Sequence, residues 1–244
     1  MKVLAPMAGI TDGKFCNKMA IYGFDILTVG GYNADQQSIK AGLKIIKRGR
    51  PEFDIAKNDL EQHITNEIKI IKNNNDYKGL VSVNLRASTP DPIINISNIP
   101  ELDIIEINAH CRQQELVQAG CGQALLKNPE LLKDFTSKVV ENCDKKVSVK
   151  MRANVPGVDN VMVAKAINDA GADFIHVDAM KPGFDCADYG VIESIRKNVD
   201  VFIIGNNSIK DLMSARNMLS AGANGFSIAR AAINGTLPFD LSMV

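Results

Sequence analysis

Eight short apolar runs recur along the whole chain and constrain its fold more than any other feature. They occupy Val3–Pro6, Ile26–Val29, Leu80–Leu85, Ile104–Ile107, Val147–Met151, Phe174–Val177, Val201–Ile204 and Gly225–Ile228. None of them alternates cleanly between polar and apolar residues, which is typical of parallel strands that are covered on both faces. The chain therefore needs helices to cover such a sheet.

Segments with a helical period lie between these runs. Apolar residues recur every three or four positions in Asn58–Lys72 and Pro129–Val140. Val161–Ala170 and Ile209–Ala221 are each followed by a glycine, which favours the end of a helix. Two other connections, numbered 35–54 and 86–100, are polar or rich in proline, and we expect them to be functional loops after strand ends.

The regular alternation of strand and helix predicts an α/β protein with a parallel sheet. Eight strands in 244 residues suit a TIM (β/α)8 barrel, and barrels of this length form single domains. A doubly wound sheet is the alternative, but no G-x-G-x-x-G motif follows an early strand. Since no linker or shift in composition divides the chain, we expect one domain over residues 1–244.

Composition excludes several classes of protein. The chain has 28 basic and 28 acidic residues, so its net charge gives no general attraction to nucleic acid or to an anionic membrane. Its five cysteines form no C-x-x-C pair, which suits a reducing compartment. No apolar run is long enough to span a bilayer. We expect a soluble cytoplasmic protein, and both a monomer and a homo-oligomer remain open.

Polar residues follow most of the predicted strands directly, and the active site of a barrel forms at these C-terminal strand ends. The strand-end segments, in chain order, are Ala5–Gly9, Asn84, Asn108–Arg112, Lys150–Arg152, His176–Asp178, Gly205–Asn207 and Ala229–Arg230. So many polar residues next to apolar strands are hard to explain by packing. The pattern predicts a binding site at this end of the barrel.

The last two strand ends suggest a phosphate site. Gly205 permits close approach of the backbone to an anion, and we expect a helix to begin near Ser208 with its amides pointing back. Arg230, after Ala229, opens the final predicted helix and can donate two hydrogen bonds to phosphate oxygens. The alternative is a glycine turn and a surface arginine.

Three other strand-end residues suit a heterocyclic ligand. Lys150 would place a cation at the barrel mouth, where it can stabilise a negatively charged ring edge or an oxyanion. Asn84 and Asn108 can each donate and accept hydrogen bonds. The alternatives are a lysine whose amine reaches solvent and amides that satisfy loop backbone groups.

Cys111 lies between two potential cations, His110 and Arg112, which would lower the pKa of its thiol. A thiol that acts as a proton donor must stay protonated, so we expect both flanking side chains to point away from the sulfur. The alternative is an inert buried cysteine. The spacing of His110, Cys111 and His176 matches no zinc pattern, and we expect no metal.

Six segments occur in order between residue 3 and about residue 235: LAPMAGITDGKF, IEINAHCRQQELVQAGCGQALLKNPELL, VSVKMR, FIHVD, IIGNNSI and ANGFSIARAAING. Together they resemble the tRNA-dihydrouridine synthases, a family of flavin-binding barrels. The resemblance implies FMN contacts at Pro6, Met7, Ala8, Asn84, Asn108, Lys150, His176, Gly205, Asn206, Ala229 and Arg230. The first three would lie under the ring system and the last four would hold the phosphate.

The resemblance also implies the chemistry. Its catalytic groups fall on Cys111, Lys150 and His176, with Cys111 as the general acid that protonates one carbon of uracil while hydride reaches the other. The expected reaction is reduction of the C5=C6 bond of uridine in tRNA, or of a related pyrimidine-like ring. The alternatives are an FMN-dependent oxidoreductase acting on a free metabolite, a non-redox phosphate-binding barrel, and a flavin-binding protein without catalysis.

The chain departs from the family pattern at several places. The family's Gly-Cys-Pro has become His110-Cys111-Arg112, and its His-x-Arg has become His176-Val177-Asp178. The chain stops at Val244, so we expect a short form without the C-terminal helical domain that binds tRNA in the family. The sequence identifies no external reductant.

Overall fold

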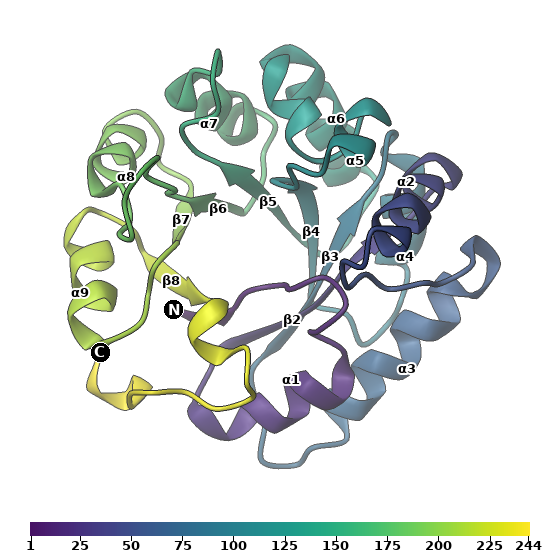
Figure 1. Ribbon diagram of the computed structural model, residues 1–244, viewed down its shortest axis with the longest axis horizontal. Coiled ribbons are helices and arrows are strands. Elements are labelled where there is room, and N and C mark those ends of the chain that lie inside the picture. The colour runs from purple at the N-terminus through teal and green to yellow at the C-terminus, as the bar shows by residue number, and fades with distance from the viewer.

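The computed structural model describes all residues from 1 to 244 as a closed barrel of eight parallel strands (Figure 1). The strands are β1 (Lys2–Leu4), β2 (Ile26–Asn33), β3 (Leu80–Arg86), β4 (Ile104–Ala109), β5 (Lys146–Arg152), β6 (Phe174–Asp178), β7 (Phe202–Asn206) and β8 (Gly225–Ile228). Each strand pairs with its neighbours in chain order, and β8 closes the barrel on β1. The predicted TIM barrel is confirmed.

Helices surround the barrel and cover the outer face of its strands (Figure 1). They are α1 (Gly13–Met19), α2 (Gln36–Lys47), α3 (Leu60–Lys72), α4 (Asp91–Ser97), α5 (Gln114–Gln118), α6 (Pro129–Glu141), α7 (Asn160–Asp169), α8 (Tyr189–Arg196) and α9 (Leu212–Ser220). Short 3-10 turns occupy Ala20–Tyr22, Lys57–Asp59, Gly122–Lys127, Arg230–Ala232 and Leu241–Met243. No helix combines the length and the apolar character needed to cross a membrane.

Two of the connections predicted as loops contain helices. In α2, the side chain of Asp35 accepts a hydrogen bond from the amide of Ser38, and the Ser38 hydroxyl bonds back to the Asp35 amide. This reciprocal cap starts a helix whose apolar stripe is narrow, so the polar composition hid it from the sequence. In α4, proline lies in the first turn, where its missing N–H is not needed.

Apolar side chains pack between the barrel and the helices in a core of 55 buried residues. Inside the barrel itself, buried polar residues from β3, β4, β5, β6 and β8 are joined by hydrogen bonds, among them Asn84, Glu106, Lys150, His176 and Ser227. A barrel interior is usually filled by branched apolar side chains. Apolar packing alone therefore does not explain the polar side chains inside this barrel.

Adjacent leucines on α6 test the packing of the helical layer. Leu132 is fully buried and Leu131 is 51% exposed. We expect Leu132→Ala to lower the free energy of unfolding by about 2–5 kcal/mol, because it leaves a cavity. Leu131→Ala, with the same change in helix propensity, should cost less than about 1 kcal/mol. Urea unfolding of both variants measures this, and equal losses would contradict the packing described here.

Candidate functional site

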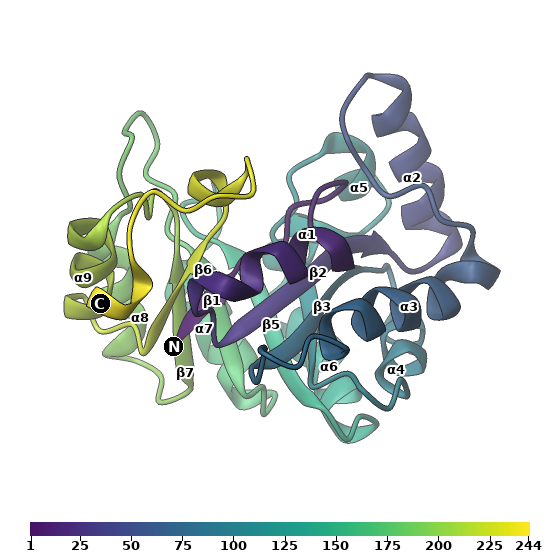
Figure 2. The ribbon, with the colours of Figure 1, turned by 90° about the horizontal axis from the view of Figure 1, so that it is seen from below.

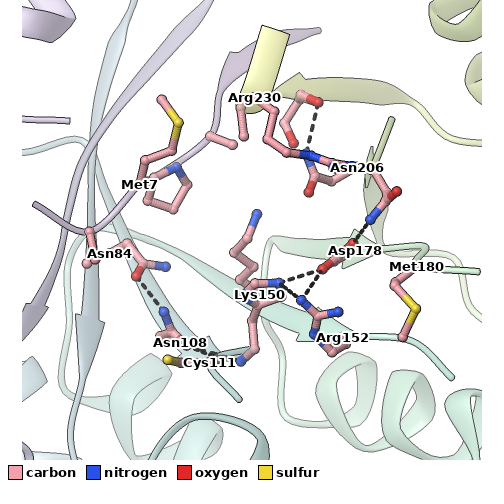
Figure 3. A pocket seen from close by; sticks show the side chains of 18 of the residues that line it. Met7, Asn84, Asn108, Cys111, Lys150, Arg152, Asp178, Met180, Asn206 and Arg230 are labelled. Carbon is pink, nitrogen blue, oxygen red and sulfur yellow. Dashed lines mark hydrogen bonds and ion pairs between the residues drawn. The ribbon is translucent and has the colours of Figure 1, made fainter. Parts of the chain in front are cut away.

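A cavity of about 700 Å³ opens at the C-terminal ends of the strands. Figure 2 shows α2, α5 and the segment after β8 along this edge of the barrel. Ten of the predicted site residues lie on the cavity wall: Pro6, Met7, Ala8, Asn84, Asn108, Cys111, Lys150, Asn206, Ala229 and Arg230. Figure 3 shows Asn84 and Asn108 facing Asp178 and Arg152 across the cavity, with Lys150 between them.

A buried chain of hydrogen bonds lies under the cavity. Glu106 accepts bonds from His176 Nδ1 at 2.7 Å, from Asn84 Nδ2 at 2.7 Å and from Ser148 Oγ at 3.0 Å. His176 Nε2 lies 2.8 Å from Lys150 Nζ. The side chains come from β3, β4, β5 and β6, so the network depends on the pairing of these four neighbouring strands. It fixes the amine of Lys150 at the base of the cavity.

The charged groups of this network shift one another's pKa values. Burial opposes ionisation of Glu106, but His176, Lys150 and the Asn84 amide outweigh it and hold the pKa of Glu106 at about 2. Burial lowers the pKa of Lys150 to about 8, and the charges of Glu106 and Asp178 keep it from falling further. Burial and the neighbouring Lys150 lower the pKa of His176. At neutral pH the network holds an anion, a neutral imidazole and a cation.

The side-chain amides of Asn108 and Asn84 hold the backbone around Cys111 in place through successive hydrogen bonds. Asn108 Oδ1 accepts hydrogen bonds from the amides of His110 at 3.1 Å and Cys111 at 2.9 Å. Asn108 Nδ2 donates to Asn84 Oδ1 at 2.8 Å, and Asn84 in turn donates to Glu106. The position of the thiol is therefore tied to the buried carboxylate under the cavity. This explains the buried location of both asparagines.

Arg86 is a site residue that the sequence analysis missed. Its guanidinium is buried, with Nη1 3.8 Å from Cys111 Sγ and Nη2 2.5 Å from Glu52 Oε2. Glu52 is also buried and lies in the segment between α2 and α3. The side chain of His110 contacts Asp178 Oδ2 through Nε2 at 2.5 Å. The cation beside the Cys111 thiol is Arg86, at the end of β3. It lies 25 residues away along the chain, so the residues next to Cys111 in the sequence do not reveal it.

A second cluster lies at the ends of β5 and β6. Asp178 contacts His110 Nε2 at 2.5 Å, Arg152 Nη2 at 3.2 Å and Asn207 Nδ2 at 2.6 Å. Burial opposes ionisation of this carboxyl, but the contacts with His110, Arg152 and Asn207 hold its pKa well below the ordinary value. His110 and Asp178 are 68 residues apart, and no local pattern predicts that they would meet.

The segment predicted to hold a phosphate forms a turn, because the helix after it starts later than expected. Helix α9 begins at Leu212, where Asp211 caps its first turn, and Arg230 lies in a 3-10 turn. Asn207 and Ser208 instead adopt φ angles of 103° and 50°, which non-glycine residues rarely do. Arg230 Nη2 lies 3.5 Å from Ser208 Oγ. Strained residues of this kind cluster at ligand sites.

Two predicted contacts, His176 and Gly205, do not lie on the cavity wall. His176 is fully buried, and its Nε2 bonds to Lys150 and to Ser227 Oγ, which lie between it and the cavity. Gly205 faces outward, where an added Cβ would lie 2.2 Å from the sulfur of Met218. Its missing side chain makes room for α9, so the predicted close approach of an anion has no support from this geometry.

Fold and cavity together define the class of protein: an α/β barrel with a polar, charged cavity where barrel enzymes have their active sites. The sequence model of the dihydrouridine synthase (Dus) family matches residues 54–239. The chain belongs to the dihydrouridine synthase family.

Relatives agree with this assignment. The chain is 39% identical over 241 residues to an uncharacterized protein of Methanocaldococcus jannaschii, covering 96% of this chain and 90% of the relative. It is 27% identical to tRNA-dihydrouridine synthase B of Pectobacterium carotovorum, covering 94% of this chain and 67% of that protein. A solved structure of FabK from Thermotoga maritima superimposes with a TM-score of 0.59 at 13% identity, covering 93% of this chain and 57% of that one. This last likeness shows the fold alone.

The lowered pKa of Glu106 gives a testable dependence of stability on pH. A folded pKa of about 2 against an ordinary 4.5 means that the unfolded chain binds more protons in this window, so stability falls as the pH falls. Between pH 5 and pH 3 the wild type should lose about 2 kcal/mol more than Glu106→Gln. Urea titrations at each pH measure the difference. The matched control is Glu101→Gln, at an exposed carboxylate, and a Glu106→Gln curve parallel to wild type would contradict the network.

Proposed function

We propose that this chain is an FMN-dependent enzyme that reduces the C5=C6 bond of uridine in tRNA. The observation that carries the proposal is that Cys111 and Lys150 lie on the wall of one cavity in a barrel of the dihydrouridine synthase family. The tRNA substrate is supported by relatives named tRNA-dihydrouridine synthase, although they share only about a quarter of their residues with this chain.

The residues on the cavity wall fit FMN. Lys150 offers a buried cation to an electron-rich ring edge, and Asn84 and Asn108 offer amide groups to ring heteroatoms. Met7 and its neighbours contribute apolar surface, and Arg230 beside the strained turn suits a phosphate. The volume lies within the range of cofactor sites. When bound, FMN would supply the hydride.

The chain's own residues account for the proton and the charge. Hydride addition to one carbon of a conjugated C=C bond leaves negative charge that a proton must quench at the adjacent carbon. Cys111 is the proton donor in this proposal, and the guanidinium of Arg86, 3.8 Å from the sulfur, stabilises the thiolate that remains. Glu52 holds Arg86 in place and balances its charge. His176 acts as a positioning residue for Lys150.

The proposal is tested with the purified chain, FMN, a chemical or nicotinamide reductant and tRNA. We expect the protein to be yellow and to form dihydrouridine in tRNA from a strain that lacks the gene. Reduction of free pyrimidines without any change in tRNA would show that the substrate is a small metabolite. A protein that stays colourless after incubation with excess FMN would overturn the flavin assignment altogether.

Replacing the proton donor should separate chemistry from binding. Cys111→Ala should retain FMN and accept hydride at the normal rate, but convert uridine at least about a hundredfold more slowly, since a positioned acid contributes about 10²–10⁴-fold. Single-turnover rates of flavin reduction and reoxidation measure the two steps. Cys143→Ala is the control, because that cysteine is absent from the cavity wall. Unchanged reoxidation by tRNA in Cys111→Ala would refute the acid role.

Removing the predicted phosphate contact should weaken cofactor binding. Arg230 is exposed, so its charge-assisted hydrogen bond is screened by solvent, and Arg230→Ala should weaken FMN binding about tenfold. Fluorescence titration of the apoprotein with FMN and with riboflavin measures the effect, which should vanish for riboflavin. Arg216→Ala, on the surface of α9, serves as control. An equal loss for both ligands would show that Arg230 does not contact the phosphate.

A further inference from the structure

Two departures from the family motif meet in space at the cavity. His110 stands where the motif has glycine, Asp178 stands where it has arginine, and His110 Nε2 lies 2.5 Å from Asp178 Oδ2. An arginine at position 178 would instead face Arg152, which now lies 3.2 Å from the carboxylate. The two replacements form a contact that neither would make alone. The two residues therefore form one structural unit on the cavity wall.

We propose that His110, held by Asp178, presents its Nδ1 atom as a hydrogen-bond acceptor to an N–H group of the substrate ring. The ligand class is a ring in the imide form, with an N–H beside a carbonyl, as at N3 of uracil. The inference rests on the proposed function and names the group that selects the ring.

The hydrogen of the imidazole is assigned by its partners. Asp178 is ionised, because it forms an ion pair with Arg152 at 3.2 Å and accepts a hydrogen bond from Asn207 at 2.6 Å, so its oxygens only accept. Nε2 must then carry the hydrogen that lies between His110 and Asp178. Burial lowers the pKa of His110, with Lys150 and Arg152 acting in the same direction and Asp178 opposing them. Arg152 Nη2 also lies 3.4 Å from His110 Nε2 and disfavours a second cation beside it, so we infer a neutral ring whose Nδ1 keeps a free lone pair.

That lone pair has no partner within the protein. His110 lines the cavity, its side chain is 24% exposed, and its only side-chain contacts run through Nε2, to Asp178 and Arg152. The backbone amide of His110 is bonded to Asn108 at 3.1 Å, so the loop that carries the ring is fixed. Because His110 lies on the cavity wall and its Nδ1 bonds to no protein group, this atom is available to a ligand N–H, which needs a partner when it is buried.

Recognition fits this geometry better than proton donation. The one hydrogen of the neutral ring points at Asp178, away from any ligand, and the low pKa of His110 leaves little imidazolium at neutral pH. The proton for the substrate carbon remains with Cys111 in the proposed reaction. His110 therefore acts on affinity and selectivity, and Asp178 acts through His110 as a positioning residue.

Imidazole NMR tests the tautomer directly. The chain has three histidines, so ¹⁵N signals can be assigned with single substitutions. We expect His110 to show the Nε2–H tautomer in wild type and to lose that preference in Asp178→Ala. Asp185→Ala is the matched control, because Asp185 also lines the cavity but is 81% exposed and pairs only with Lys210. An Nδ1–H tautomer in wild type would overturn the inference.

Ligand selectivity tests the role, with uridine monophosphate and 3-methyluridine monophosphate as probes of the FMN-loaded protein. We expect uridine monophosphate to move the His110 Nδ1 signal and to bind at least fivefold more tightly than the methylated probe. In His110→Phe this preference should shrink to within about twofold, and His110→Gln, which keeps an acceptor, should restore part of it. Equal preference in wild type and His110→Phe, or no shift at 50 mM probe, would overturn the inference.

The outcome also separates this inference from the proposed function. If tRNA gains dihydrouridine while His110→Phe keeps the full preference, the enzyme assignment holds and the role of His110 is wrong. If tRNA is unchanged but the preference depends on His110, the site recognises a free imide-containing ring and the tRNA assignment is wrong.

Discussion

The buried ion pair network of Glu106, His176 and Lys150 is the constraint on which the rest of the site depends. Burying an unpaired charge in a barrel is too costly to tolerate, so the carboxylate, the imidazole and the amine must occur together. Each comes from a different strand, and each bond lies near 2.7–2.8 Å. The pairing of β4, β5 and β6 therefore determines where the cation lies, and it places that cation on the cavity wall.

The same carboxylate also governs the loop that carries the thiol. Glu106 holds Asn84, Asn84 holds Asn108, and Asn108 holds the amide of Cys111. The Lys150 amine and the Cys111 backbone, the cation and the proton donor of the proposed reaction, therefore share one buried anchor. Removal of that anchor would disturb both together. The asparagines thus have a structural reason to be present, whether or not they also contact a ligand.

The sequence predicted the barrel and most of the cavity wall because strand ends can be located from apolar runs. It does not determine the direction in which a side chain points. His176 and Gly205 were expected at the ligand, but one lies beneath Lys150 and the other faces Met218. Arg86 was missed because its partners, Glu52 and Cys111, come from other elements. The local order of apolar and polar residues does not predict contacts between segments that are far apart in the sequence.

His110 and Asp178 show what such contacts add to a family resemblance. Taken one at a time, each looks like decay of a motif, since a glycine and an arginine have been lost. Taken together they form a hydrogen-bonded pair with Arg152 and Asn207 around the same carboxylate. These contacts keep the buried carboxylate of Asp178 paired, and an unpaired carboxylate there would be strongly destabilising. Balanced charge accounts for the stability of the pair, and the proposed contact between His110 Nδ1 and a ring N–H would account for its place on the cavity wall.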